Sequence, residues 1–226
     1  MDRKNEGSPG GDKGAVLVIG MGRFGSRLAL TVERLGREVL AVESDPEVIR
    51  RWSGRISLVE ADATDPDALD QLGAQEFPIA VVGVGTALEA SVLITSNLVD
   101  LGTAQVWAKA TSAEHKRILE RIGADHVVLP EADAAERLAH LVSGKLLDYI
   151  EFEDGFTIVK MRPPKETVGF TLGQLEIRKR YGVTVIGVKS PGVEFEYAAD
   201  ETRIGARDLL IVSGNTTLLD RFASRP

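Results

Sequence analysis

The feature that most constrains the fold is a regular alternation of strand-length apolar runs and helix-length segments between residues 15 and 130. The first run, AVLVIG at 15–20, is continuously apolar, as in a strand buried on both faces of a parallel sheet. Apolar residues then recur at helical spacing over 23–36, up to a glycine suited to end a helix. Strand-helix alternation implies right-handed crossovers, so we predict an α/β fold with a Rossmann-like doubly wound parallel sheet. Further strands are predicted at 38–43, 56–62, 79–85, 105–110 and 126–130, and helices at 65–73, 88–101 and 113–122, with another helix start at Ser44-Asp45-Pro46.

The alternation stops after Pro130, which indicates a second, smaller α+β domain. Residues 131–150 have the pattern of one long connecting helix, bent near Ser143-Gly144 where helix propensity is weakest. We therefore expect a disordered leader at 1–13, a nucleotide-binding domain at 14–143 and a ligand-binding domain at 144–226. In the last of these, short strands are predicted at 149–152, 156–161, 183–188 and 209–213, and a short helix at 172–180.

Composition excludes several classes of protein. The chain has no cysteine, which rules out disulfides, thiolate zinc sites and cysteine nucleophiles. No apolar run approaches the roughly 18 residues needed to cross a bilayer, so we expect no direct membrane insertion. The net charge is −7, and residues 151–226 hold 11 basic and 11 acidic residues. The acidic excess therefore lies in 1–150 and argues against nucleic-acid binding.

A glycine-rich loop follows the first predicted strand. Gly20, Gly22 and Gly25 have G-x-G-x-x-G spacing between a strand and a helix. In this context the first glycine permits a tight turn, the second lets a phosphate approach the backbone, and the third lets helix and strand pack closely. The helix N-terminus adds free N–H groups and positive potential. The loop therefore predicts a nucleotide phosphate site.

Acidic residues end the next two predicted strands. Glu43 lies 23 residues after Gly20, where a carboxylate accepts hydrogen bonds from ribose hydroxyls and repels a 2′-phosphate. NADP is thus disfavoured, while NAD and adenosine nucleotides both remain. Asp62, followed by Ala63 and Thr64, lies at the same sheet edge and either flanks the adenine or caps a turn.

Catalytic groups are not evident beside this loop. His115, His126 and His140 show neither triad nor metal spacing, and we expect each to be a surface or boundary residue. The P-loop, H-E-x-x-H and G-x-S-x-G motifs are all absent from the sequence. A dehydrogenase would need a proton donor or acceptor beside the cofactor. The residues predict nucleotide binding without predicting chemistry.

Several motifs in order resemble the cytoplasmic RCK (KTN) regulatory subunits of potassium transport, of the KtrA and TrkA type. The resemblance covers about residues 15–220 and has a TrkA-C-like end. It includes the Arg23-Phe24 pair inside the glycine loop. The matching stretches are GMGRFG at 20–25, AVE at 41–43, EADAT at 60–64, VWAKA at 106–110, IGADHVVLPE at 122–131 and RKRYGVTVIGV at 178–188.

The resemblance implies a regulator, not an enzyme, that binds ATP or ADP. Subunits of this kind form dimers that assemble into an octameric ring on a membrane potassium channel or transporter. Arg23 would reach the phosphates of nucleotide in the neighbouring subunit, and Lys109 would lie near the site. Glu131 matches a glutamate that helps hold Mg²⁺ or Ca²⁺; its alternative role is that of a first-turn acid favoured by the helix dipole. Gly22, Glu43, Asp62 and Thr64 would line the site.

The C-terminal part resembles the domain that binds cyclic di-AMP in some KtrA-like proteins. Arg178 matches the arginine that meets that ligand, and Phe170, Leu172, Ile177 and Tyr181 are its possible neighbours; they are equally well explained as small-domain core. Two other functions stay open: a TrkA-like regulator that senses NAD or NADH, and an NAD-dependent oxidoreductase. Related proteins commonly have Asp where this chain has Glu43, so the residue does not decide between ATP and NAD as the ligand.

Overall fold

The computed structural model describes residues 14–85, 87–142, 146–152 and 155–225. The predicted leader at 1–13 and the predicted bend at Ser143-Gly144 lie outside these residues. The chain divides into two compact units, Met1–Glu131 and Ala132–Pro226. Helix α6 (Pro130–Val142) begins in the first unit and continues in the second. The domain boundary predicted after residue 143 stays a prediction.

The first unit is a parallel sheet of six strands in the order β3-β2-β1-β4-β5-β6, which confirms the predicted doubly wound fold. Val18 of β1 pairs with Ala41 of β2 on one side and Val81 of β4 on the other. Strand order reverses between β1 and β4, and ligands of such sheets bind at that switch point. The elements are β1 (Val16–Ile19), α1 (Arg23–Arg34), β2 (Val39–Glu43), α2 (Pro46–Trp52), β3 (Leu58–Glu60), α3 (Pro66–Gln71), η1 (Ala74–Glu76), β4 (Ile79–Val82), α4 (Leu88–Asp100), β5 (Val106–Lys109), α5 (Ala113–Arg121) and β6 (His126–Val128).

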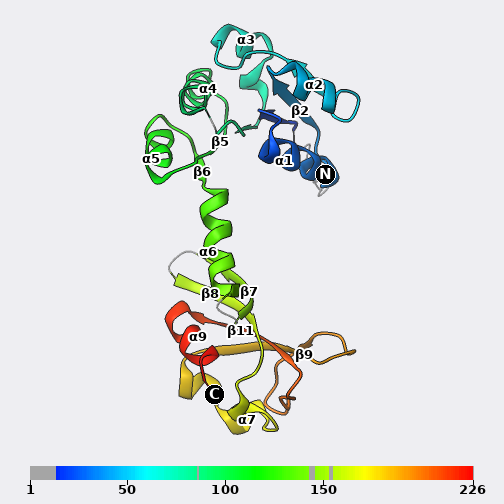
Figure 1. Ribbon diagram of the computed structural model, residues 1–226, viewed down its shortest axis with the longest axis vertical. Helices are drawn as coiled ribbons and strands as arrows, with labels where there is room; N and C mark the ends of the chain where they lie inside the picture. Colours follow the sequence, from blue (N-terminus) through cyan, green and yellow to red (C-terminus); the bar gives the residue numbers. More distant parts are fainter. Residues whose placement is uncertain (1–13, 86, 143–145, 153–154, 226) are drawn as a thin grey trace, which may run out of the picture. The chain divides into compact units, whose positions relative to one another are not determined.

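Each face of this sheet has its own core. Val16 and Val18 of β1 point toward Leu28 and Val32 of α1. Alternate residues of the same strand belong to the core on the opposite face, which includes residues of α3, α4 and α5. Helices α1 and α2 therefore cover one face and α4 and α5 the other, as Figure 1 shows. This two-sided burial is why the strands read as continuous apolar runs.

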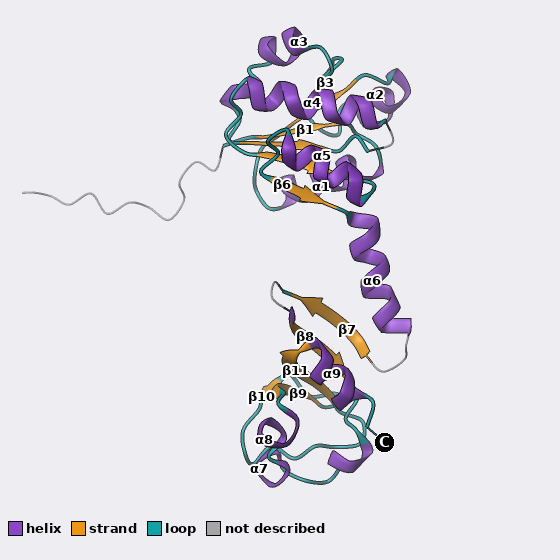
Figure 2. Ribbon diagram, turned by 90° about the vertical axis from the view of Figure 1, so that its left-hand side faces the viewer, coloured by secondary structure: helices purple, strands orange, loops and turns teal. Residues whose placement is uncertain are grey.

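The second unit is an antiparallel sheet of five strands in the order β10-β9-β11-β8-β7, drawn in orange in Figure 2. Its core includes Met161, Leu210 and Phe222, the last on helix α9. The predicted smaller α+β domain is thereby confirmed. Its elements are β7 (Leu146–Glu151), β8 (Phe156–Met161), η3 (Lys165–Thr167), α7 (Leu172–Leu175), α8 (Ile177–Tyr181), β9 (Thr184–Lys189), β10 (Glu196–Tyr197), β11 (Leu209–Asn215) and α9 (Thr216–Ala223).

Two local predictions are wrong. Residues 146–148 were expected to continue the connecting helix but begin strand β7, because Leu146 and Asp148 pair with Met161 and Lys160 of β8; the strand predicted from Tyr149 is confirmed. Tertiary pairing overrides the helix propensity of a leucine-rich segment. The helix predicted at 172–180 is two short helices, interrupted where Glu176 has a left-handed φ of 45°.

None of the helices in the described ranges has the length and apolarity that crossing a bilayer requires.

His115 also differs from expectation, since its exposed fraction is 1%. It lies in the first turn of α5 with its side chain facing inward, and the Thr111 N–H donates to its Nδ1 at 3.3 Å. Nε2 has no partner among the described residues. Burial lowers the pKa of His115 below the ordinary value of 6.5.

The lowered pKa of His115 predicts an acid-sensitive first unit. As pH falls below 6.5, the unfolded chain takes up this proton before the folded chain does, so stability is lost as pH falls toward the folded pKa. Both tryptophans, Trp52 and Trp107, lie in the first unit, so denaturant unfolding followed by their fluorescence reports on it. We expect the stability advantage of wild type over His115→Gln to shrink from pH 7.5 to 5.5. A pH-independent difference would contradict this, and exposed His126→Gln is the matched control.

Candidate functional site

A pocket of about 550 Å³ lies at the carboxyl edge of the parallel sheet, over the loops that follow β1 and β4. This is the switch point at which doubly wound sheets bind ligands. The pocket brings together the glycine loop, the acid that ends β2, the lysine that ends β5 and a glutamate that follows β6. Its lining residues are Gly20, Gly22, Arg23, Phe24, Glu43, Asp45, Val48, Gly83, Val84, Gly85, Lys109 and Glu131.

The glycines have the geometry that a phosphate site needs. Gly20 has a φ of +90°, and a Cβ on Gly25 would lie 1.9 Å from the Gly20 carbonyl oxygen. Gly22, by contrast, has no atom within 4 Å of its would-be Cβ, so space over the loop is open. Helix α1 has no side-chain N-cap and no acidic residue in its first turn. Its amide groups are therefore available to an anion, and the residues fit a nucleotide phosphate.

An ion pair closes one end of the pocket. Lys109 Nζ lies 2.7 Å from Glu131 Oε1, and the exposed side-chain fractions are 13% for Lys109 and 66% for Glu131. The ammonium also lies 5.7 Å from the centroid of the Phe24 ring, within range of a cation–π interaction. The hydrogen bond from Lys109 holds the pKa of Glu131 below its usual value, and the charge of Arg23 adds a smaller effect.

Arg23 is exposed and lines the pocket of its own chain. Glu43 also lines the pocket, and the Met21 N–H donates to its Oε2 at 2.7 Å. The lining residues include no histidine, serine, threonine or tyrosine. The arrangement can bind an anionic ligand between Lys109, Arg23 and the α1 N-terminus.

The segment Asp62-Ala63-Thr64 is not among the lining residues of this pocket. Asp62 Oδ1 accepts the Thr64 N–H at 3.0 Å and the Thr64 hydroxyl at 2.7 Å, and these bonds lower the pKa of Asp62. Ala63 is buried in the core. Asp62 therefore shapes the turn after β3, and its role as a nucleotide contact stays a prediction.

Sequence reasoning missed five lining residues, and two of them had a signal. Gly83 and Gly85 follow β4 as a second glycine pair at the switch point. A Cβ on Gly83 would lie 3.1 Å from the Gly20 carbonyl oxygen, and one on Gly85 would lie 3.4 Å from the Lys109 side chain. Close approach of two loops thus explains both glycines. The other three, Asp45, Val48 and Val84, carried no such pattern.

A divalent cation has limited support from these residues. No group of three or more acidic or histidine side chains with metal-binding geometry occurs within the described part of the chain. Glu131 alone would supply one oxygen, whereas Mg²⁺ and Ca²⁺ need several. Its carboxylate already pairs with Lys109. A metal at this position would need further oxygens from a bound ligand.

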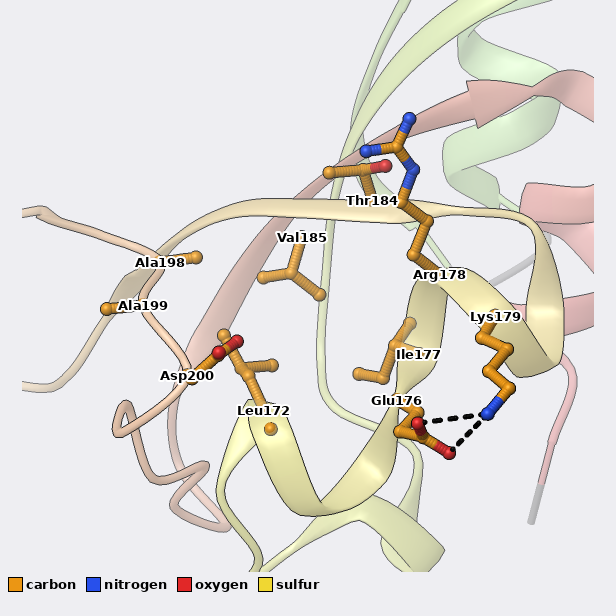
Figure 3. Close-up of a pocket in the computed structure, with 11 residues that line it drawn as sticks. Leu172, Glu176, Ile177, Arg178, Lys179, Thr184, Val185, Ala198, Ala199 and Asp200 are labelled. Carbon is orange, nitrogen blue, oxygen red and sulfur yellow. Dashed lines mark hydrogen bonds and ion pairs between the residues drawn. The ribbon is translucent and has the colours of Figure 1, made fainter.

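A second pocket, of about 400 Å³, lies in the smaller unit (Figure 3). It includes three of the residues predicted to meet a second ligand: Leu172, Ile177 and Arg178. Figure 3 shows Arg178 extending beside Thr184 while Lys179 pairs with Glu176, at 3.2 Å and 3.4 Å. The full lining is Leu172, Gly173, Glu176, Ile177, Arg178, Lys179, Thr184, Val185, Ala198, Ala199 and Asp200.

Two other predicted neighbours, Phe170 and Tyr181, are not among the residues that line this pocket. Phe170 is 50% exposed. The Tyr181 hydroxyl donates to Glu166 Oε1 at 3.2 Å, and its ring lies under the Arg225 guanidinium at 4.5 Å. Tyr181 therefore belongs to a contact between α8 and the C-terminal segment.

Comparison with known proteins gives consistent results. The profile of the TrkA-N domain family matches residues 16–130. Ktr system potassium uptake protein C of Bacillus subtilis (strain 168) is 36% identical over 211 residues, covering 92% of this chain and 95% of that protein. Ktr system potassium uptake protein A of the same organism is 32% identical over 207 residues, covering 91% and 93%.

Among solved structures, the GsuK channel bound to NAD superposes with a TM-score of 0.64 at 18% identity. The match covers 96% of this chain and 41% of that one, so this chain spans less than half of that protein's length. Identity at this level shows a shared fold alone. The expected resemblance to potassium-transport regulators is confirmed by the family profile and the Ktr relatives.

Proposed function

This chain belongs to the TrkA-N domain family, and from that premise we propose that it is a regulatory subunit of a membrane potassium transport system, controlled by ATP and ADP. It acts in the cytoplasm on its membrane subunit and has no enzymatic activity. The Ktr names of its relatives support the potassium system, and the pocket supports the nucleotide.

The observation that favours ATP and ADP is the position of Lys109. Lys109 ends β5, on the side of the switch point where a dinucleotide places its second half. A cation with only 13% of its side chain exposed, in an ion pair at that end, suits terminal phosphates better than a nicotinamide ring. The alternative, an NAD- or NADH-sensing regulator, has the same fold and role. An oxidoreductase is disfavoured because the described lining residues include no histidine or tyrosine, and Lys109 and Glu131 pair with each other.

The proposed switch is a competition for Lys109. In the structure its ammonium pairs with Glu131, which is the last residue of the first unit and lies in the first turn of α6. Terminal phosphates would take Lys109 and release Glu131. ATP and ADP differ in the reach and charge of those phosphates, so they differ in how strongly they compete. A regulator needs this difference, because a ligand that binds two states equally shifts nothing.

Assembly is the other half of the proposal. By family resemblance, subunits pair as dimers and form a ring of eight on the membrane subunit, with Arg23 reaching the phosphates of nucleotide in the neighbouring copy. Its exposure at the pocket rim is compatible with either its own or a neighbour's ligand. Glu131, once released, would supply one oxygen to Mg²⁺ or Ca²⁺, with the remaining oxygens coming from the phosphates.

Arg23→Ala tests the role assigned to the loop arginine. We expect the preference for ATP over ADP to fall about tenfold, because a charge-assisted hydrogen bond to the terminal phosphate is lost. Titration calorimetry of the assembled protein with each nucleotide gives the ratio. Arg27→Ala is the matched control, since Arg27 lies one turn further along α1, is exposed and does not line the pocket. An unchanged ratio in Arg23→Ala would reject this role.

For the second pocket we propose cyclic di-AMP as the ligand, on the strength of the family resemblance and the place of Arg178. Arg178→Ala is expected to weaken cyclic di-AMP binding at least about tenfold, because an arginine–phosphate contact is lost. Arg180→Ala is the control: it belongs to the same basic run and does not line the pocket. Equal affinities for the two variants in titration calorimetry would rule out Arg178 as the contact.

A further inference from the structure

The Glu43 carboxylate, at the end of β2, accepts three backbone hydrogen bonds. Oε2 accepts the Met21 N–H at 2.7 Å. Oε1 accepts the N–H groups of Ser44 at 2.8 Å and Asp45 at 3.1 Å. One side chain therefore joins the glycine loop after β1 to the turn that opens α2.

The bond to Met21 fixes the part of the loop that must wrap a phosphate. Met21 lies between the first two glycines of the loop and is 1% exposed. The adjacent Gly20 N–H donates to the Val42 carbonyl at 2.8 Å. Two successive amides of the loop are thus held by the end of β2, one by its backbone and one by its side chain.

A count of acceptor positions shows what is left for a ligand. An ionised carboxylate has about four lone-pair positions, and three are used by these N–H groups. One position on Oε2 is left for a ribose hydroxyl. Hydrogen bonds to a charged acceptor are roughly twice as strong as neutral ones. A contact with ribose would use only one of the four acceptor positions, so it does not by itself explain the placement of the Glu43 carboxylate.

The length of the side chain matters for the same reason. An aspartate is shorter by one C–C bond, about 1.5 Å. Its carboxylate would not span from the β2–α2 turn to Met21, which lies 22 residues earlier in another loop. The bond to the Met21 amide therefore needs the extra methylene of glutamate.

We infer that Glu43 is a positioning residue of the glycine loop: its carboxylate clamps the Met21 amide and so holds the loop in the shape that receives phosphate. This inference rests on the proposed function, because it assumes that the pocket over the loop takes a nucleotide. Glu43 then sets phosphate affinity through the loop as well as ribose affinity by contact.

A ligand without ribose separates the two roles. Tripolyphosphate should bind wild type, and Glu43→Gln should weaken it about tenfold, since one charge-assisted bond of the clamp is lost. Removing a negative charge beside an anion would by itself strengthen binding. Loss of the clamp and loss of charge repulsion therefore predict opposite changes in tripolyphosphate affinity for Glu43→Gln. Glu43→Asp keeps the charge and should also weaken tripolyphosphate. Asp45→Asn is the control: it removes a charge from the same pocket and touches no part of the loop.

Hydrogen exchange at the Met21 amide provides a test without any ligand. The clamp predicts that Met21 loses protection at least about tenfold in Glu43→Gln and Glu43→Asp, while Val18 in the adjacent strand is unaffected. Unchanged Met21 exchange together with unchanged or tighter tripolyphosphate binding would overturn the inference. If wild type binds neither ATP nor tripolyphosphate, the proposed function fails, and the exchange result alone then decides the clamp.

Discussion

Gly25→Ala is expected to destabilise the first unit by about 3 kcal/mol or more, a value at the upper end for overpacking. The new Cβ would lie 1.9 Å from the Gly20 carbonyl oxygen and 3.1 Å from its carbonyl carbon. Both atoms are backbone, so no rotamer change relieves the clash. Relief would require α1 to move off the sheet and would break the packing of Leu28 and Val32.

Denaturant unfolding followed by fluorescence of Trp52 and Trp107 measures this loss. Gly22→Ala is the matched control, because nothing lies within 4 Å of its would-be Cβ and its φ is −64°. We expect it to retain stability within about 1 kcal/mol, the usual cost of alanine at an N-cap. Its methyl would occupy the space proposed for phosphate, so nucleotide binding should fall. Equal stability of the two variants would contradict the close packing of Gly25.

Lys109→Met is expected to have the largest effect on ligand binding, a loss of roughly 10- to 100-fold in ATP affinity. Methionine keeps the apolar stem, and 13% of the Lys109 side chain is exposed, so folding should survive. The loss comes from the missing ammonium beside the terminal phosphates. Without Lys109 the pKa of Glu131 should also rise toward its ordinary value of 4.5, because the hydrogen bond that lowers it most is gone.

The competition for Lys109 also predicts a change of opposite sign. In the absence of divalent metal, Glu131→Gln should bind ATP more tightly than wild type, because the competing carboxylate is lost. Titration calorimetry of both variants measures these shifts, and Lys116→Met, at a paired lysine on α5, is the control. If Lys109→Met leaves ATP affinity unchanged, the proposed switch is wrong.

The parallel sheet could be predicted because the sequence patterns that specify it lie within single strands and one short loop. Strands buried on both faces appear as continuous apolar runs, and glycine spacing fixes the loop between the first strand and helix. Lys109 and Glu131 were placed near the site by the family resemblance, and both line the pocket. The ion pair between them follows from side-chain geometry and had no sequence signal.

Features that depend on tertiary contact could not be predicted. Strand β7 is set by pairing with β8, which comes later in the chain and overrides local helix propensity. Burial of His115 depends on which face of α5 turns toward the interior of the unit. The Glu43 clamp joins residues 22 positions apart through one side chain, and an acid at the end of the second strand predicts only a ribose contact.

Titration calorimetry of the nucleotide-stripped protein with ATP, ADP, NAD and NADH, each with and without Mg²⁺, tests the central claim most directly. We expect ATP and ADP to bind more tightly than either dinucleotide, and Mg²⁺ to strengthen ATP binding in wild type but not in Glu131→Gln. Tighter binding of NAD or NADH than of both adenosine nucleotides, or no nucleotide binding at all, would contradict it.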